Sequence, residues 1–167
     1  FAEVHLDRVH VPDSMVVGEV GAGWQQVTSE LAYERSGPER FLSSFLLLGE
    51  LINQTSINDW INDCAAAEIG SLAARLWALR ELSLHVQHLL DEGHTPDVEA
   101  AMVKDGGTRL EQEVVEVARR AIADLPAVPP EPLASMLRSA QLAAPTFTLR
   151  GGTVEILRGI IAKEVGA

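Results

Sequence analysis

The sequence predicts an all-α protein, a four-helix bundle preceded by a short β remnant. Apolar residues recur every three or four positions over long stretches, proline and glycine separate these stretches, and alternation of apolar with polar residues is confined to the first positions. Amphipathic helices joined by short loops pack as mainly antiparallel neighbours around one core. We therefore expect a helical bundle domain over residues 22–167 and the end of a β-domain over residues 1–21.

The N-terminal segment has the pattern of a strand. Apolar and polar residues alternate from 4 to 11, with one slip at Arg8-Val9 that a β-bulge would absorb. A second short strand is expected at 15–17, before Gly18. Two strands do not make a stable sheet alone. We therefore expect their partner strands to come from upstream sequence.

The first helical stretch runs from Trp24 to about Gln54 and is interrupted by Ser36-Gly37-Pro38-Glu39. This tetrapeptide has the S-x-x-E form of a capping box, which would allow a new helix to start at Ser36. The apolar positions keep their helical phase across the interruption. We therefore favour a single helix that is kinked at the proline.

The later helices follow from the same spacing and from their end signals. Gly106-Gly107 lies inside one of them and lowers its helix propensity by about 1 kcal/mol per glycine, so we expect another helix to pack closely there. Residues 146–149 read as an extended stretch. The predicted helices span residues 56–91, 95–125, 131–143 and 154–165.

Composition excludes several classes of function. The chain has 24 acidic and 13 basic residues and a net charge of −11, whereas a nucleic-acid surface needs basic patches that neutralise phosphate. Its apolar runs are too short for a membrane span. We expect a cytoplasmic protein with no nucleic-acid partner.

Metal chemistry is also not expected. The single cysteine, Cys64, rules out an internal disulfide and a CxxC metal site, and its apolar neighbours predict a buried structural thiol. His85 and His88 are spaced for a metal, but they lie near a helix end, where a solvated cationic side chain is the commoner arrangement. We therefore predict no metal site.

Glu34 is the strongest candidate for a catalytic residue. Counting in helical steps places it on one stripe with Trp24, Val27 and Leu31, followed by Pro38, which cannot donate a hydrogen bond to the Glu34 carbonyl. A carboxylate among apolar neighbours is a stronger base than one in water and can take a weakly acidic carbon-bound proton. The alternative, which periodicity alone favours, is a structural ion pair with Arg35 or Arg40.

A second candidate is Gly151-Gly152-Thr153, which precedes the last helix. Glycines allow a ligand to approach the backbone, and the N-H groups at a helix start favour a phosphate. Taken alone, such a loop with a threonine cap is more often an ordinary helix start, and Glu155 would then simply compensate the helix dipole.

Several segments together resemble the acyl-CoA dehydrogenase family. The resemblance covers the end of that family's middle β-domain and its whole C-terminal helical domain. It rests on residues 1–12, 17–24, 31–35, 151–158 and 160–163.

The resemblance implies a reaction and residues that carry it. In the family a flavin, FAD, takes a hydride from Cβ of an acyl-CoA while a glutamate removes the α-proton. One of the two known positions of this base corresponds to Gly151, which cannot act, and the other corresponds to Glu34. By the same resemblance Arg35 would orient the base and the acyl-CoA. The positions that approach the flavin are Gly152, Thr153 and Glu155.

Two departures from the family leave an alternative open. The usual Arg-x-x-Phe-Gly segment has no counterpart near residues 55–63, and residues 121–130 replace the usual Gln-x-x-Gly-Gly stretch that contacts a neighbour's FAD. The chain in this respect resembles subunits of actinobacterial heteromeric acyl-CoA dehydrogenases of sterol and lipid catabolism. The alternative is a flavin-poor or non-catalytic assembly subunit.

Both interpretations include assembly and an incomplete site. We expect a homo- or hetero-oligomer formed through the helical bundle, with apolar faces near Trp60 and Trp77 available for packing between subunits. The chain alone is expected to be inactive, because the resemblance places one wall of the flavin site in the absent β-domain.

Overall fold

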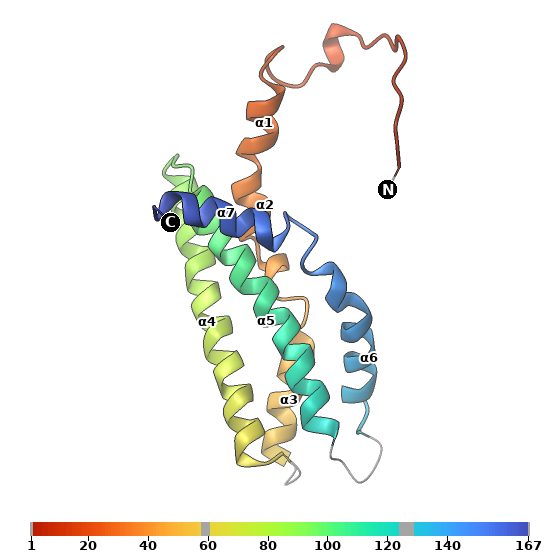
Figure 1. Ribbon diagram of the computed structural model, residues 1–167, viewed down its shortest axis with the longest axis vertical. Coiled ribbons are helices and arrows are strands. Elements are labelled where there is room, and N and C mark those ends of the chain that lie inside the picture. Colours follow the sequence, from red (N-terminus) through yellow and green to blue (C-terminus); the bar gives the residue numbers. More distant parts are fainter. Residues whose placement is uncertain (1, 58–60, 124–128, 167) are drawn as a thin grey trace.

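The computed structural model describes residues 2–57, 61–123 and 129–166, and it confirms the all-α fold. Helix α4 (Asp63–Asp91) and helix α5 (Asp97–Ala123) run antiparallel, side by side, over most of the molecule's length (Figure 1). Helix α3 (Phe45–Ile57) and helix α6 (Leu133–Ala143) complete the bundle around α5. The described part of the chain contains no strand.

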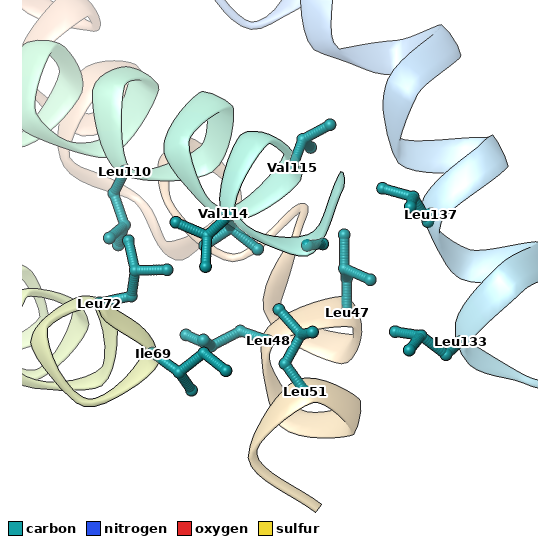
Figure 2. Close-up of a cluster of buried hydrophobic side chains, with 12 residues drawn as sticks. Leu47, Leu48, Leu51, Ile69, Leu72, Leu110, Val114, Val115, Leu133 and Leu137 are labelled. Atoms are coloured by element: carbon teal, nitrogen blue, oxygen red, sulfur yellow. The ribbon is translucent and has the colours of Figure 1, made fainter. Parts of the chain in front are cut away.

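The core lies where α3, α4, α5 and α6 meet, and Figure 2 shows their aliphatic side chains pointing toward one another. Leucine, isoleucine and valine recur at helical spacing on each helix, so every helix buries one stripe. Each such side chain contributes about 1.5–3 kcal/mol when it is fully buried. The buried members are Leu47, Leu48, Leu51, Ile69, Leu72, Leu110, Val114, Val115, Val117, Ala118, Leu133 and Leu137.

Three shorter helices lie at one end of the bundle. Helix α2 (Leu31–Ser36) and helix α7 (Val154–Glu164) both pack on α5, and α1 (Gly23–Ser29) precedes α2. A short 3-10 turn, η1 (Asp13–Met15), lies within the N-terminal segment, which leads away from the bundle (Figure 1).

The strands expected at 4–11 and 15–17 are not formed. Residues 2–12 have no regular structure, Arg8 has a positive φ of 48°, and the apolar side chains of this segment are exposed. A strand needs a neighbouring strand for its backbone hydrogen bonds, and the described residues provide none. The assignment of residues 1–21 to a β-domain therefore stays a prediction.

The expectation of one kinked helix across residues 36–39 is wrong. Helix α2 ends at Ser36, Gly37 is extended, and residues 38–40 form a 3-10 turn, η2 (Pro38–Arg40), before α3 begins at Phe45. The capping-box alternative at Ser36 is not realised either. Pro38 has no N-H for the Glu34 carbonyl, and the residue before a proline is driven out of helical conformation.

Other expectations differ at their boundaries. Helix α4 begins at Asp63 and not near Ser56, because the Asn62 side chain accepts a hydrogen bond from the Ala65 N-H and caps a new helix. Cys64, expected to be buried, is exposed in this first turn. Trp60 and residues 124–128 lie outside the described residues.

The segment expected to be extended at 146–149 is instead helical in character. It follows the 3-10 turn η3 (Ala144–Thr146) and continues as turns, with Phe147 only 3% exposed. Phe147 is buried and its carbonyl accepts hydrogen bonds from Lys104 and Thr108, which holds this segment against α5. The final helix, α7, lies where the sequence predicts it.

The close packing expected at Gly106-Gly107 is confirmed. A Cβ atom added at Gly107 would lie 2.4 Å from the Arg40 carbonyl oxygen and 3.0 Å from Phe41 Cβ, and one added at Gly106 would lie 2.9 Å from Leu79 Cδ2. Glycine at these positions lets η2 and α4 approach α5. The cost in helix propensity is offset by this contact.

We predict that Gly107→Ala destabilises the fold by about 2 kcal/mol or more, because the methyl group would push η2 off α5. Gly70→Ala is the matched control, since Gly70 is a helical glycine with open space where a Cβ would lie. We expect this substitution to raise the free energy of unfolding by ~0.5–1 kcal/mol. Urea unfolding of both variants measures the difference. Equal effects of the two substitutions would show that the contact at Gly107 is unimportant.

Candidate active site

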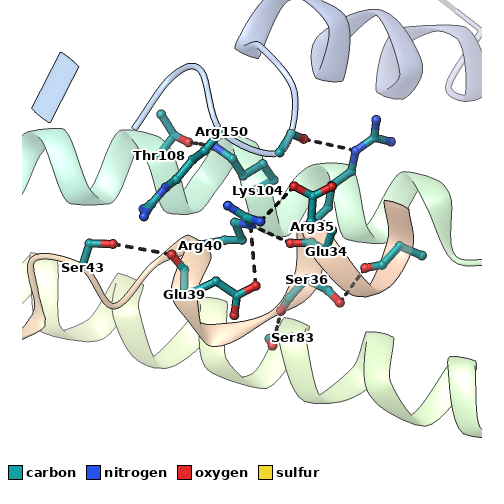
Figure 3. Close-up of polar contacts among 12 residues, drawn as sticks. Glu34, Arg35, Ser36, Glu39, Arg40, Ser43, Ser83, Lys104, Thr108 and Arg150 are labelled. Carbon is teal, nitrogen blue, oxygen red and sulfur yellow. Dashed lines mark hydrogen bonds and ion pairs between the residues drawn. The ribbon is translucent and has the colours of Figure 1, made fainter. Parts of the chain in front are cut away.

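The two segments singled out by the sequence meet at the end of the bundle. Arg35 Nε donates a hydrogen bond to the Gly151 carbonyl oxygen at 3.3 Å, across 116 positions of sequence (Figure 3). They meet because α2 and α7, the helices beside these segments, both pack on α5. Arg35 is only 8% exposed, and it forms no ion pair with any carboxylate among the described residues.

Glu34 lies beside this contact, at the surface of the chain. Its side chain is 45% exposed and pairs with Arg40, whose Nη2 lies 3.0 Å from Glu34 Oε1. Trp24 and Val27 on the same stripe are also exposed, so this chain alone does not give the acid the apolar surroundings expected for it. The ion pair with Arg40 is the alternative that the sequence left open, and it forms. The role of Glu34 as a base stays a prediction.

Arg40 makes a second contact with the same residue. Its Nε donates to the Glu34 backbone carbonyl at 2.6 Å, and its side chain is only 11% exposed. That carbonyl would accept from residue 38 in a continuous helix, but Pro38 has no N-H. The guanidinium therefore satisfies a carbonyl that the proline leaves without a partner.

The loop before α7 has the backbone expected of its glycines. Gly151 and Gly152 have φ angles of +67° and +103°, which side chains disfavour, and Thr153 is the N-cap of α7. Hydrogen bonds from its own backbone N-H and then from the Thr153 hydroxyl lower the pKa of Glu155. The Glu155 carboxylate therefore already compensates the positive end of the helix dipole at the start of α7.

Buried charged side chains on α5 form the part of the site that the sequence reasoning missed. Lys104 and Glu111 are both fully buried. Lys104 donates to Thr108 Oγ1 and, at 2.9 Å, to the Phe147 carbonyl, while Glu111 pairs with Arg150 at 2.5 Å. These contacts fasten the segment from Phe147 to Gly151 onto α5.

A sequence signal for these residues exists. Lys104, Thr108 and Glu111 are spaced by four and three positions, so they share one helix face. That face also carries Ala100 and Val115, which are buried. Charged residues on an apolar stripe mark buried ion pairs, which is the same reasoning that singles out Glu34.

Burial, followed by the nearby Arg150 guanidinium, lowers the pKa of Lys104 to about 8, while Glu111 opposes the shift. A lysine ordinarily has a pKa near 10.5. The folded protein therefore holds the Lys104 proton less tightly than the unfolded chain does. The protonated lysine costs the folded state ~3 kcal/mol at neutral pH, and this cost disappears as the pH rises through the unfolded value.

Metal and membrane features are absent from the described ranges. They contain no group of three or more histidine, cysteine, aspartate or glutamate side chains placed to hold a metal ion. No helix in them is both long and apolar enough to cross a membrane.

We predict that the free energy of unfolding of the wild-type chain rises by about 2 kcal/mol between pH 7.5 and pH 10 relative to Lys104→Met. The folded-state pKa is the lower one, so the unfolded chain binds more protons in this window and stability increases with pH. Urea unfolding at both pH values gives the difference. Lys163→Met, which removes an exposed lysine, is the control and should follow the wild type. If the free energy of unfolding had the same pH dependence in all three proteins, the lowered pKa of Lys104 would be contradicted.

Comparison with known proteins gives the family. A model described as the acyl-CoA dehydrogenase C-terminal domain matches residues 62–166. The acyl-CoA dehydrogenase FadE34 of Mycobacterium tuberculosis is 28% identical over 99% of this chain, which spans only 22% of that protein. The solved Tcur3481-Tcur3483 steroid ACAD and a variant of it share the fold, with TM-scores of 0.73 and 0.75 at 23% and 24% identity, over 94% of this chain and 43% of theirs. The chain belongs to the acyl-CoA dehydrogenase family and carries its C-terminal helical domain.

Proposed function

We propose that this chain is the C-terminal domain of a flavin-dependent acyl-CoA dehydrogenase, with Glu34 as the base that takes the α-proton of the acyl-CoA. The observation that carries the proposal is the hydrogen bond between Arg35 and the Gly151 carbonyl, because it joins the helix that holds Glu34 to the loop before α7. Gly151 has no side chain and cannot be a base, whereas α2 carries a carboxylate beside this junction. Glu34 is the carboxylate that α2 supplies.

The exposure of Glu34 suits this role. A base must reach a carbon-bound proton of a substrate that approaches from outside the bundle, and the Glu34 side chain is 45% exposed. The exposed stripe of Trp24 and Val27 beside it would be covered by the substrate or by another domain, which would give the carboxylate its apolar surroundings. Arg35, which is buried and has no carboxylate partner among the described residues, supplies positive charge beside the reacting thioester.

The loop before α7 would contribute backbone groups to a flavin site. Gly151 and Gly152 leave the backbone bare at a partly exposed turn, and the first N-H groups of an eleven-residue helix follow. Gly152 and Thr153 would hold the cofactor there, with Glu155 fixing the first turn of α7. When bound, the flavin supplies the acceptor for the hydride that leaves Cβ.

A second candidate function is an assembly subunit with little or no flavin. It is favoured by an exposed apolar face between α3 and α4, where a groove of about 600 Å³ is lined mostly by apolar side chains. Such a face suits packing against another helical bundle, in a homo- or hetero-oligomer. Exposed members of the face are Leu42, Phe45, Ile52, Trp77 and Leu84.

Flavin content and acyl-CoA oxidation separate the two functions. We expect the full-length protein, alone or co-expressed with a homologous subunit, to carry flavin and to oxidise an acyl-CoA. Absorbance of the purified protein measures the flavin, and reduction of an artificial electron acceptor measures the activity. Absence of both, in either preparation, would favour the assembly subunit.

We predict that Glu34→Gln lowers kcat by about 10³-fold, because the amide cannot accept the α-proton. Glu39→Gln is the matched control: Glu39 is a neighbouring exposed acid that also faces Arg40, at 3.7 Å, and its loss should change kcat less than about twofold. Steady-state kinetics of the full-length protein with an acyl-CoA measures both variants. Full activity of Glu34→Gln would refute the assignment of the base and leave the family unchanged.

A further inference from the structure

The Arg40 side chain contacts both the carboxylate and the backbone carbonyl of Glu34. Its Nη2 pairs with the Glu34 carboxylate at 3.0 Å, its Nε donates to the Glu34 carbonyl at 2.6 Å, and Glu39 lies 3.7 Å away (Figure 3). One rigid guanidinium thus holds both the backbone and the side chain of Glu34. Because the guanidinium is planar, the backbone contact fixes the direction in which the carboxylate can be held.

Gly151 provides the space for this guanidinium. A Cβ atom added at Gly151 would lie 3.4 Å from both Cζ and Nε of Arg40, and 3.3 Å from Cε of Lys104. The separation from Lys104 is tighter than most Cβ contacts, and the separations from Arg40 are at the short limit of ordinary van der Waals contact. Lys104 is fully buried and hydrogen-bonded to Thr108 and to the Phe147 carbonyl, so it cannot easily move aside. A side chain at 151 would therefore press on Arg40.

We propose that Arg40 is the positioning residue for Glu34, and that the missing side chain at Gly151, besides suiting the φ of +67°, leaves room for the Arg40 guanidinium. The inference rests on the proposed function, in which Glu34 is the base. Pro38 creates the need, because it leaves the Glu34 carbonyl without a helical donor. Arg40 meets that need and, with the same group, orients the carboxylate. The absence of a side chain at 151 and the position of the base on α2 are then linked through the Arg40 guanidinium.

An arginine that merely stabilises the fold and one that positions a base differ in kinetics. In the full-length protein we expect Arg40→Ala to lower kcat about 10- to 100-fold while KM changes less than about threefold, because a misplaced base slows proton removal without weakening substrate binding. Methylguanidinium added at millimolar concentration should restore part of kcat. Arg40→Lys should be intermediate, since one ammonium group cannot serve the carbonyl and the carboxylate with the same geometry.

Arg75→Ala is the matched control for loss of an ion-paired arginine. Arg75 pairs with Glu113 between α4 and α5, away from Glu34, and its removal should change kcat less than about twofold. A similar kcat in Arg40→Ala and Arg75→Ala, while Glu34→Gln is inactive, would overturn the inference and leave Glu34 as the base. Full activity of Glu34→Gln, or a full-length protein that oxidises no acyl-CoA, would overturn both proposals.

The role of Gly151 has its own readout in thermal unfolding. Gly151→Ala should lower the melting temperature more in the wild-type background than in Arg40→Ala, because the methyl group and the guanidinium compete for one space. Gly93→Ala is the control, since Gly93 has a similar φ of +82° and open space around it. This substitution should lower the melting temperature by the same amount in both backgrounds. Equal losses for Gly151→Ala in the two backgrounds would contradict the steric part of the inference.

Discussion

The contact between η2 and α5 at Gly107 is the constraint on which the site depends. The Arg40 carbonyl lies where a side chain at 107 would be, so the chain can cross α5 at this point only over a glycine. This crossing brings the Arg40 side chain to Glu34 on one side and to the Gly151 loop on the other. A wider separation at 107 would move Arg40 away from both segments that carry the proposed chemistry.

Buried charge on α5 then holds the loop in place. Lys104 and Glu111 take two positions on a stripe that would otherwise be aliphatic, and they bind the Phe147 carbonyl and Arg150. Glu111 also accepts a hydrogen bond from the Ser43 N-H at 2.8 Å, which ties the chain leading into α3 to the same helix. Burying these charges lowers stability. In return the start of α3 and the segment after η3 are fixed relative to one another, which an aliphatic stripe would do with less directional precision.

The sequence predicts the fold better than the site. Helices α5 and α7 and the end of α4 follow from apolar spacing together with Pro96, Gly93 and Gly152, because these signals act within one turn of helix. The break between α2 and α3 is not predicted, since the apolar phase continues across it while Pro38 and the approach of η2 to Gly107 decide the backbone. The strands at 4–11 could not be judged from pattern alone, because a strand depends on a neighbour.

For the site, the sequence selects α2 and the Gly151 loop, but not what joins them. The Arg35 to Gly151 contact spans 116 positions, and no local pattern carries information over that distance. Helical spacing also predicts a buried stripe of Trp24, Val27 and Glu34, whereas these side chains are exposed in this chain. Apolar residues at helical spacing predict only that an apolar surface packs against that face of the helix. Whether that is the chain's own core, a substrate or another domain depends on the rest of the fold.

The same ambiguity separates the two proposed functions. An exposed apolar stripe on α1 and α2 beside a half-exposed carboxylate suits a substrate, whereas an exposed apolar face on α3 and α4 without a carboxylate at its centre suits another subunit. The Glu34 to Arg40 pair distinguishes them further. A structural ion pair gains little at 45% exposure of its acid. The stabilising contact of Arg40 is the hydrogen bond from Nε to the Glu34 carbonyl, which Pro38 leaves without a helical donor. The same guanidinium also sets the direction of the Glu34 carboxylate, which a base requires and a bundle face that only binds another subunit does not.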